Sequence, residues 1–156
     1  MTLLRLLGIP WLTCVFLVSL PSMAQAPAAP EFSKAELSAT PAAVQSFLTL
    51  VDSGKYSEAW PMVSKHVQAL SGPTVWAVGM RGLRTAAGPL KSRNAIAAGP
   101  VPADNKMPAG GRYFAVFYDA SFANIETEEK VILSLEGGDW KVVGYFLSKC
   151  FGTRCG

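Results

Sequence analysis

The sequence predicts an α+β fold in which three N-terminal helices pack on an antiparallel sheet of about four strands. Between residues 41 and 88, apolar side chains recur every three to four positions, which is the period of an amphipathic helix. After Gly88 they recur at every second position, which is the period of a strand with one buried face. With 156 residues, 50% of them apolar and 16% charged, the chain is long enough for one domain with its own core. These values exclude a disordered, highly charged tail.

The first 24 residues have the pattern of a signal peptide. Arg5 is followed by an almost wholly apolar stretch, residues 6–20, and small residues follow that stretch. Cleavage is expected after Ala24, with Ala26 as the alternative site. An uncleaved membrane anchor is the other interpretation, but the apolar run is shorter than the roughly 20 residues that span a membrane, and Pro10 interrupts it. We therefore expect a periplasmic or secreted protein with a Sec-type signal and no stable membrane anchor after cleavage.

The number of cysteines that remain after cleavage is consistent with export. Cys14 is removed with the signal peptide, and Cys150 and Cys155 remain as an even pair. An oxidising compartment allows these two to form one disulfide, which would close the C-terminal tail, residues 150–156, and contribute about 2 kcal/mol in the chain-entropy model. A redox or metal role is the alternative, although a metal site requires more ligands than two thiolates and the distant His66.

The first helix is expected to begin at Thr40. Residues 25–40 are rich in Ala, Pro and Ser and are interpreted as a leader, so the domain is expected to span residues 41–149. Thr40 is a suitable N-cap, and Pro41 at the first helical position lacks only an N–H that would have no partner there. Gly54 is expected to stop the helix. The apolar stripe at helical spacing consists of Val44, Phe47, Leu48 and Val51.

A second helix is predicted from Ser57 to Leu70 and a third from Pro73 to Gly88. Pro61 is compatible with the second helix only if that helix begins near Ser57, because N–H groups of the first turn have no intrahelical partner. The buried stripe of the third helix is predicted to contain Trp76, Met80, Leu83 and Ala87.

Strands are predicted at residues 90–98, 112–122, 126–136 and 140–147. Gly137-Gly138-Asp139 is a hairpin signal between the last two strands. One sheet face is predicted to carry Phe114, Val116, Tyr118, Phe122, Val131, Leu133 and Leu135. Residues 99–111 form a long connection without a hydrophobic pattern, which is either a functional rim loop or slack.

Charged residues are predicted to meet between the helices and the sheet. Glu129 shares strand parity with Val131 and Leu133, so it is expected to point toward the apolar face, where a carboxylate requires a cation. Arg84, at the edge of the stripe on the third helix, and Arg93 are the natural partners. This group is either a structural ion pair or a constellation that faces an anionic ligand, and the sequence leaves both interpretations open.

No motif for catalysis, a cofactor or a metal is found. The sequence lacks a nucleophile elbow, a Walker loop, a zinc-protease motif and a dinucleotide-binding glycine pattern. The only histidine, His66, would need a carboxylate such as Asp119 or Glu129 beside it for acid–base chemistry. The net charge of +3, which falls to +2 when Arg5 leaves with the signal peptide, is too small to indicate a nucleic acid partner.

Short motifs follow one another in a definite order along the chain. They are Leu50-Val51-Asp52-Ser53-Gly54-Lys55-Tyr56 with Trp60, then Trp76, Arg84-x-x-x-Gly88, Ser92-Arg93, Tyr113, Ser121-Phe122-Ala123-Asn124, Glu129, and Gly138-Asp139-Trp140-Lys141-Val142-Val143-Gly144-Tyr145. This succession, over residues 44–146, resembles the DUF4019 family of exported bacterial proteins, which has no assigned biochemical activity. The resemblance implies an NTF2-like or cystatin-like α+β roll, whose curved sheet can hold a small molecule against the helices. Residues 108–112 depart from the more acidic turn of the family, so no function of this loop is implied.

Within such a roll, Trp60, Trp76 and Trp140 are expected to anchor the helices on the sheet. Gly144 is expected to let a neighbouring side chain approach the last strand closely. Tyr145 has the opposite parity from Trp140, so its hydroxyl is expected on the far face of the sheet. The candidate ligand-binding residues are Arg84, Arg93, Glu129 and Tyr145.

Three functions are compatible with these features. The favoured one is a non-catalytic binding module of the cell envelope, with an unknown small molecule or protein as its partner. A homodimeric envelope protein is the first alternative, with a band that includes Tyr113, Phe117 and Tyr145 buried in the second copy. An enzyme with His66 or Glu129 as its base is the other, and it requires a deep cavity in which a second polar group lies near that base.

Overall fold

The computed structural model describes residues 31–103, 107–151 and 154–155, and from residue 149 onward it describes the backbone alone. The predicted signal peptide, residues 1–24, lies outside these ranges. The elements are α1 (Lys34–Asp52), α2 (Tyr56–Ala59), the 3-10 helix η1 (Trp60–Met62), α3 (Lys65–Leu70), α4 (Pro73–Ala87), β1 (Leu90–Val101), β2 (Tyr113–Phe122), β3 (Glu126–Glu136), β4 (Asp139–Phe151) and β5 (Arg154–Cys155).

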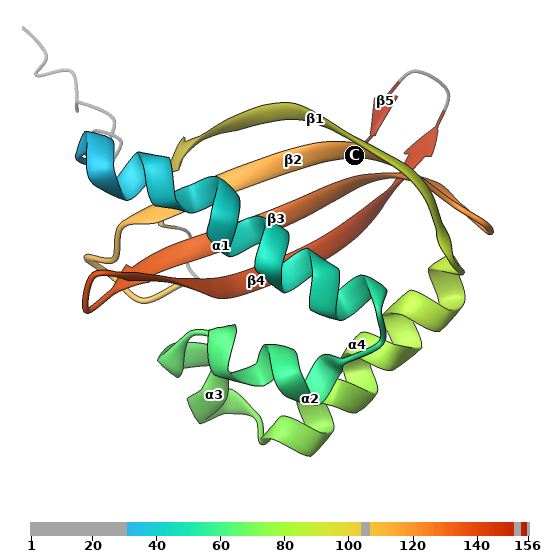
Figure 1. The fold of residues 1–156 in the computed structure, drawn as a ribbon, viewed down its shortest axis with the longest axis horizontal. Helices are drawn as coiled ribbons and strands as arrows, with labels where there is room; N and C mark the ends of the chain where they lie inside the picture. Colours follow the sequence, from blue (N-terminus) through green and yellow to red (C-terminus); the bar gives the residue numbers. More distant parts are fainter. Residues whose placement is uncertain (1–30, 104–106, 152–153, 156) are drawn as a thin grey trace, which may run out of the picture.

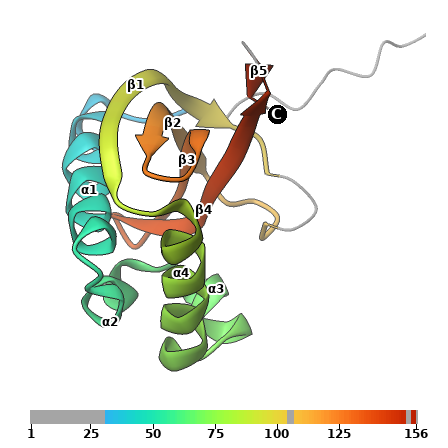
Figure 2. The same cartoon turned by 90° about the vertical axis from the view of Figure 1, so that its right-hand side faces the viewer.

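The predicted α+β class is confirmed. The helices come first, and β1 to β4 then form an antiparallel sheet in sequence order, with the two-residue β5 paired to the end of β4. Figure 1 shows α1 lying across one face of this sheet, with α2, α3 and α4 gathered beyond β4. Figure 2 shows β1 arching around β2 and β3. Two register shifts in β1 contribute to this curvature, because a bulge bends its strand.

The expected start of the first helix at Thr40 is wrong, because α1 begins at Lys34. Ser33 caps the helix through a capping box: its Oγ accepts from the Glu36 backbone N–H, and the Glu36 carboxylate accepts from the Ser33 N–H. Pro41 therefore lies inside the helix. The Thr40 hydroxyl donates to the Glu36 carbonyl at 3.3 Å. The helix tolerates both the proline and this hydrogen bond because burial of its inner face stabilises it.

The predicted second helix is interrupted at Pro61. The chain forms α2, a single turn of 3-10 helix and then α3, which Ser64 caps. A proline in the interior of a helix removes a hydrogen bond and crowds the preceding turn. Val63 between the two helices is extended and bridges to Val142, and the Ser64 N–H donates to the Val142 carbonyl at 2.9 Å. The break thus attaches the helical layer to the edge of β4.

The third helix and the last hairpin lie where the sequence predicts them. α4 spans Pro73–Ala87, with Met80 and Ala87 buried, and Gly88 follows it at a φ of 80°. Gly137 and Gly138 both have positive φ, 62° and 95°, as a tight turn between β3 and β4 requires. The first strand is longer than predicted, and it takes residues 99–101 from the expected connection.

A bulge in β4 makes the predicted orientation of Tyr145 wrong. Leu133 pairs with Val142, but Ile132 pairs with Gly144, so one residue of β4 is extra. Because the extra residue inverts the alternation of side chains, Val142 and Tyr145 both point toward α1. Tyr113 was also predicted to belong to an exposed band of the sheet. This prediction is wrong, because Tyr113 is 1% exposed.

The core lies between α1 and the inner sheet face. Phe47 and Leu48 of α1 pack with Val131 and Leu133 of β3. Trp140 packs near Phe114 and donates from its indole N–H to the Glu36 carbonyl at 2.8 Å, which confirms it as an anchor of α1 on the sheet. Trp60 and Trp76 instead pack on each other, with ring centroids 5.6 Å apart, so they join helices rather than helix and sheet. Within the described ranges no helix is long and apolar enough to cross a membrane.

Candidate functional site

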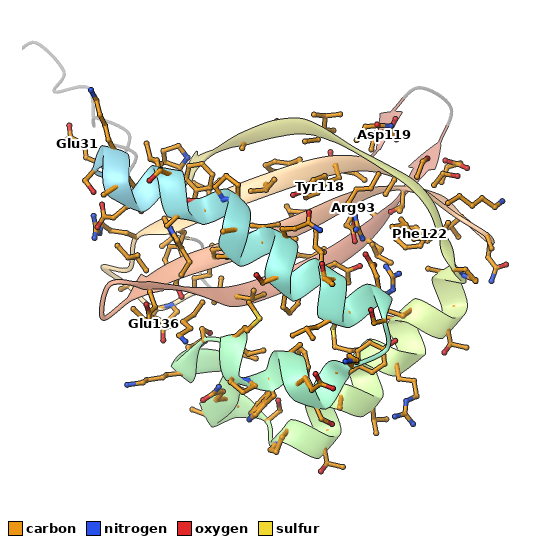
Figure 3. All side chains as sticks on the ribbon, viewed as in Figure 1. Glu31, Arg93, Tyr118, Asp119, Phe122 and Glu136 are labelled. Carbon is orange, nitrogen blue, oxygen red and sulfur yellow. The ribbon has the colours of Figure 1, made fainter. Side chains whose placement is uncertain are left out.

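Five elements each contribute one side chain to a cluster of charged and polar groups, which we call the charged cluster. Its members are Asp52 of α1, Arg84 of α4, Arg93 of β1, Glu129 of β3 and Tyr145 of β4. Figure 3 shows Arg93 at the end of the sheet that also carries Tyr118 and Phe122. The predicted candidate ligand-binding residues therefore do meet in space.

Glu129 is the buried centre of the charged cluster. Its side chain is 0% exposed. The Arg93 Nε–H donates to Glu129 Oε2, and Arg93 Nη2 donates to Oε1 at 2.8 Å, so the guanidinium binds the carboxylate in a bidentate manner. The predicted inward orientation of Glu129 and its pairing with an arginine are confirmed.

Asp52 joins both arginines. Arg93 Nη1 and Nη2 donate to its Oδ2 and Oδ1 at 2.7 and 3.0 Å, and Arg84 Nη2 lies 2.9 Å from Oδ1. Asp52 is the last residue of α1, where the helix dipole disfavours a negative charge. The two guanidinium groups offset that effect. Asp52 was not among the predicted site residues. The available signal was its position directly after Val51, the last residue of the apolar stripe.

Tyr145 completes the charged cluster from the opposite side. Its hydroxyl donates to Glu129 Oε1 at 2.6 Å and accepts from Arg84 Nη1 at 3.0 Å. Burial raises the pKa of the Tyr145 hydroxyl, and the negative charge of Glu129 raises it further. The hydroxyl is therefore a permanent donor at neutral pH.

Aromatic rings cover the two guanidinium groups. Arg84, 7% exposed, lies 4.4 Å from the centroid of the Phe122 ring, and Arg93 lies 5.9 Å from that of Tyr118. Burial alone would lower the pKa of Arg93, but its hydrogen bonds to Asp52 and Glu129 outweigh this and raise it. In formal charge, the two guanidinium groups balance the two carboxylates.

The charged cluster is complete without a further group. Among the described side chains, no buried nitrogen or oxygen atom lacks a hydrogen-bond partner. A pocket of about 470 Å³ adjoins Asp52 and Arg84, but those groups already bind each other at its wall. This geometry favours the structural interpretation of the charged cluster over the ligand-facing one.

An apolar pocket adjoins the charged cluster at Tyr145. This inner pocket has a volume of about 230 Å³ and lies between the helices and β4. Phe47 packs edge-on to the Tyr145 ring, with centroids 5.9 Å apart. The lining residues are Phe47, Val63, Val67, Trp76, Met80, Val142, Val143, Gly144, Tyr145 and Phe146.

A second apolar pocket lies on the other side of β4. This outer pocket, of about 130 Å³, is lined by His66, Val67, Leu70, Met107, Ile132, Val143, Gly144 and Phe146. His66 is the only residue of this lining with a titratable side chain. The fold therefore places His66 on the outer side and Glu129 inside the core, and the acid–base pair that an enzyme would need is not assembled from these two residues.

The family follows from a comparison with known sequences. Residues 43–145 match the family described as "Protein of unknown function (DUF4019)". The chain belongs to DUF4019. The match extends from α1 to Tyr145, so it contains the whole charged cluster and nearly all of the inner pocket. No curated protein and no solved structure matches this DUF4019 chain. In the described part of the chain, no group of His, Cys, Asp and Glu residues is arranged to hold a metal ion.

Proposed function

We propose that this DUF4019 protein is an exported, non-catalytic binding module and that its ligand occupies the inner pocket. The observation that carries the proposal is the dual position of Tyr145, whose ring lines the inner pocket while its hydroxyl is fixed by Glu129 and Arg84. The charged cluster then has a clear role. It holds one wall of an apolar site in a defined orientation.

The chemistry of the lining indicates the class of ligand. The inner pocket presents aliphatic and aromatic side chains, and its polar side-chain groups are the Tyr145 hydroxyl, which already has two partners, and the indole N–H of Trp76. A charged ligand group would lose its hydration there without gaining an oppositely charged partner, because the lining contains none. A cavity of about 150 Å³ lined by apolar residues holds benzene. The inner pocket, at about 230 Å³, therefore suits an uncharged ring or short hydrocarbon chain.

Calorimetric titration with 1-hexanol tests this proposal. The protein is expected to bind hexanol with a negative heat-capacity change, because apolar surface is buried. Val67→Phe places an additional ring at a residue that lines the pocket, so the binding heat should disappear. Val78→Phe is the matched control, because Val78 is 63% exposed on α4 and should leave binding unchanged. Equal heats in the two variants, or none in the natural protein, would contradict the proposal.

Export is a separate part of the proposal. It rests on the signal pattern of residues 1–24 and on the even pair of cysteines that remain after cleavage. The backbone register of β4 and β5 is compatible with a disulfide, because Cys150 pairs directly with Cys155, although their side chains lie outside the described ones. Intact mass of the protein recovered from the exported fraction should match a chain that begins after Ala24 or Ala26. It should also be lower than the dithiol mass by two hydrogen atoms.

A further inference from the structure

The inner and outer pockets meet at the bulge of β4. Val67, Val143, Gly144 and Phe146 line both of them. The Phe146 ring lies over Gly144, since a Cβ atom at residue 144 would come within 3.0 Å of the ring Cζ. This confirms the expectation that Gly144 permits a close approach. Where the two pockets meet, the Phe146 side chain, 47% exposed, therefore rests on a residue that has no side chain.

We infer that the two pockets form one elongated site for a free fatty acid, whose chain displaces the Phe146 ring from Gly144 and whose carboxylate lies outside, at Lys130. The inference rests on the proposed function, because it extends the ligand of the inner pocket to a longer molecule of defined chemistry. The inner pocket holds the methyl end of the chain, and the outer pocket leads the chain to the surface.

The shapes of the two pockets favour a single hydrocarbon chain. Each pocket is small, about 230 and 130 Å³, and they share four lining residues at the bulge. By comparison with the cavity of about 150 Å³ that holds benzene, each has room for a short portion of one chain. A bulky polycyclic ligand would not fit the smaller pocket, and a short ligand would leave it unfilled.

Lys130 is positioned to bind the carboxylate. In the sheet register, Lys130 lies between Phe117 and Phe146 on the outer face, and its Nζ is 5.8 and 5.2 Å from their ring centroids. It forms no ion pair with a carboxylate of the described residues, whereas Arg84, Arg93 and Arg112 all do. A cation held over apolar rings at the rim of an apolar site favours an anionic head group on a hydrocarbon tail.

Methionine methyl groups distinguish the two parts of the site. Met80 lines only the inner pocket and Met107 only the outer one, so labelled methyl signals report each part separately by NMR. The probes are hexanoate, dodecanoate and dodecyltrimethylammonium, each below its micelle concentration. Dodecanoate is expected to shift both methyl signals, and the cation with the same chain should bind at least tenfold more weakly. Hexanoate is too short to fill both pockets and should not shift both signals.

Two pairs of variants locate the chain and its head group. Ile132→Phe fills the outer pocket and should weaken dodecanoate binding at least fivefold, whereas Ile96→Phe, on the exposed side of β1, should not. Lys130→Gln should remove the preference for dodecanoate over dodecyltrimethylammonium. Lys91→Gln, an exposed lysine of β1, is the control and should leave that preference intact.

Failure of this inference is distinguishable from failure of the proposed function. If hexanol binds at Met80 but dodecanoate does not shift Met107, the inner pocket binds ligands and the elongated site is wrong. If dodecanoate and dodecyltrimethylammonium bind equally, the role of Lys130 is wrong. If no probe shifts Met80, the proposed function itself fails.

Discussion

The Tyr145 hydroxyl lies 2.6 Å from Glu129 Oε1, although these residues belong to different strands and are not paired in register. Val131 is the register partner of Tyr145, so the tyrosine reaches diagonally along the inner face to the buried carboxylate. This contact links the charged cluster to the inner pocket. Its consequences for stability and binding can be separated by substitution.

Glu129→Gln should destabilise the fold strongly. The change removes a carboxylate that is 0% exposed and leaves Arg93 and Arg84 with an uncompensated positive charge. Breaking a buried ion pair on one side typically costs about 3–5 kcal/mol. Urea unfolding measures this loss. Glu128→Gln is the matched control, because Glu128 directly precedes Glu129 and lies on the outer face of β3. It should change the unfolding free energy by less than about 0.5 kcal/mol.

Tyr145→Phe should reduce stability while keeping the shape of the inner pocket. The variant loses one hydroxyl that donates to Glu129 and accepts from Arg84. The expected cost is about 1–3 kcal/mol, because Glu129 and Arg84 each lose one buried hydrogen bond. In Tyr118→Phe the cost should be close to zero, since the Tyr118 hydroxyl has no hydrogen bond within the described residues. Equal unfolding midpoints for the two variants would contradict this role of Tyr145.

Glu36 should make stability depend on pH under acidic conditions. Its hydrogen bond to Arg112, followed by that to the Ser33 N–H, lowers its pKa from 4.5 to about 2. A group whose pKa is lower in the folded state contributes stability above its unfolded pKa and loses it as the pH falls. The protein should therefore lose stability between about pH 5 and pH 2. In Glu36→Gln that part of the pH dependence should be absent, and the two unfolding curves should converge near pH 2.

Gly144→Ala should be costly only while Phe146 is present. The added methyl group would meet the Phe146 ring, which must then move. Overpacking of this kind costs about 1–3 kcal/mol in a core, and we expect the lower end because the ring is half exposed. In a Phe146→Ala background the same change should cost almost nothing. A double-mutant cycle in unfolding free energy measures this coupling, and additive effects would show that the ring does not rest on Gly144.

The period of the apolar pattern and the parity of residues along each strand predicted much of the fold and part of the charged cluster. The alternation around Glu129 indicated that this carboxylate points inward, and the helical stripe placed Arg84 beside it. These features depend on local geometry, which one sequence records directly. The break at Pro61 was not predicted, because a tertiary contact, the bridge from Val63 to β4, accompanies it. The early start of α1 was missed although its signal is local, since Ser33 and Glu36 form a capping box.

The position of Tyr145 required information that the sequence pattern does not contain. One extra residue at Val143–Gly144 reverses the faces of the strand beyond it, and nothing in the period of two marks where a bulge occurs. Asp52 was missed for a related reason. A single carboxylate at a helix end is usually solvated, and only the approach of two arginines from distant elements gives it a structural role.

The most direct test of the inner pocket is the detection of NMR nuclear Overhauser contacts between 1-hexanol and the Met80 methyl group. Met80 is 7% exposed, so a molecule that contacts it must lie inside the pocket rather than on the surface. We predict contacts from hexanol to Met80 and to the Tyr145 ring in the natural protein, and their loss in Val67→Phe. Contacts that appear only at exposed side chains such as Val75 and Val78 would contradict the proposed site.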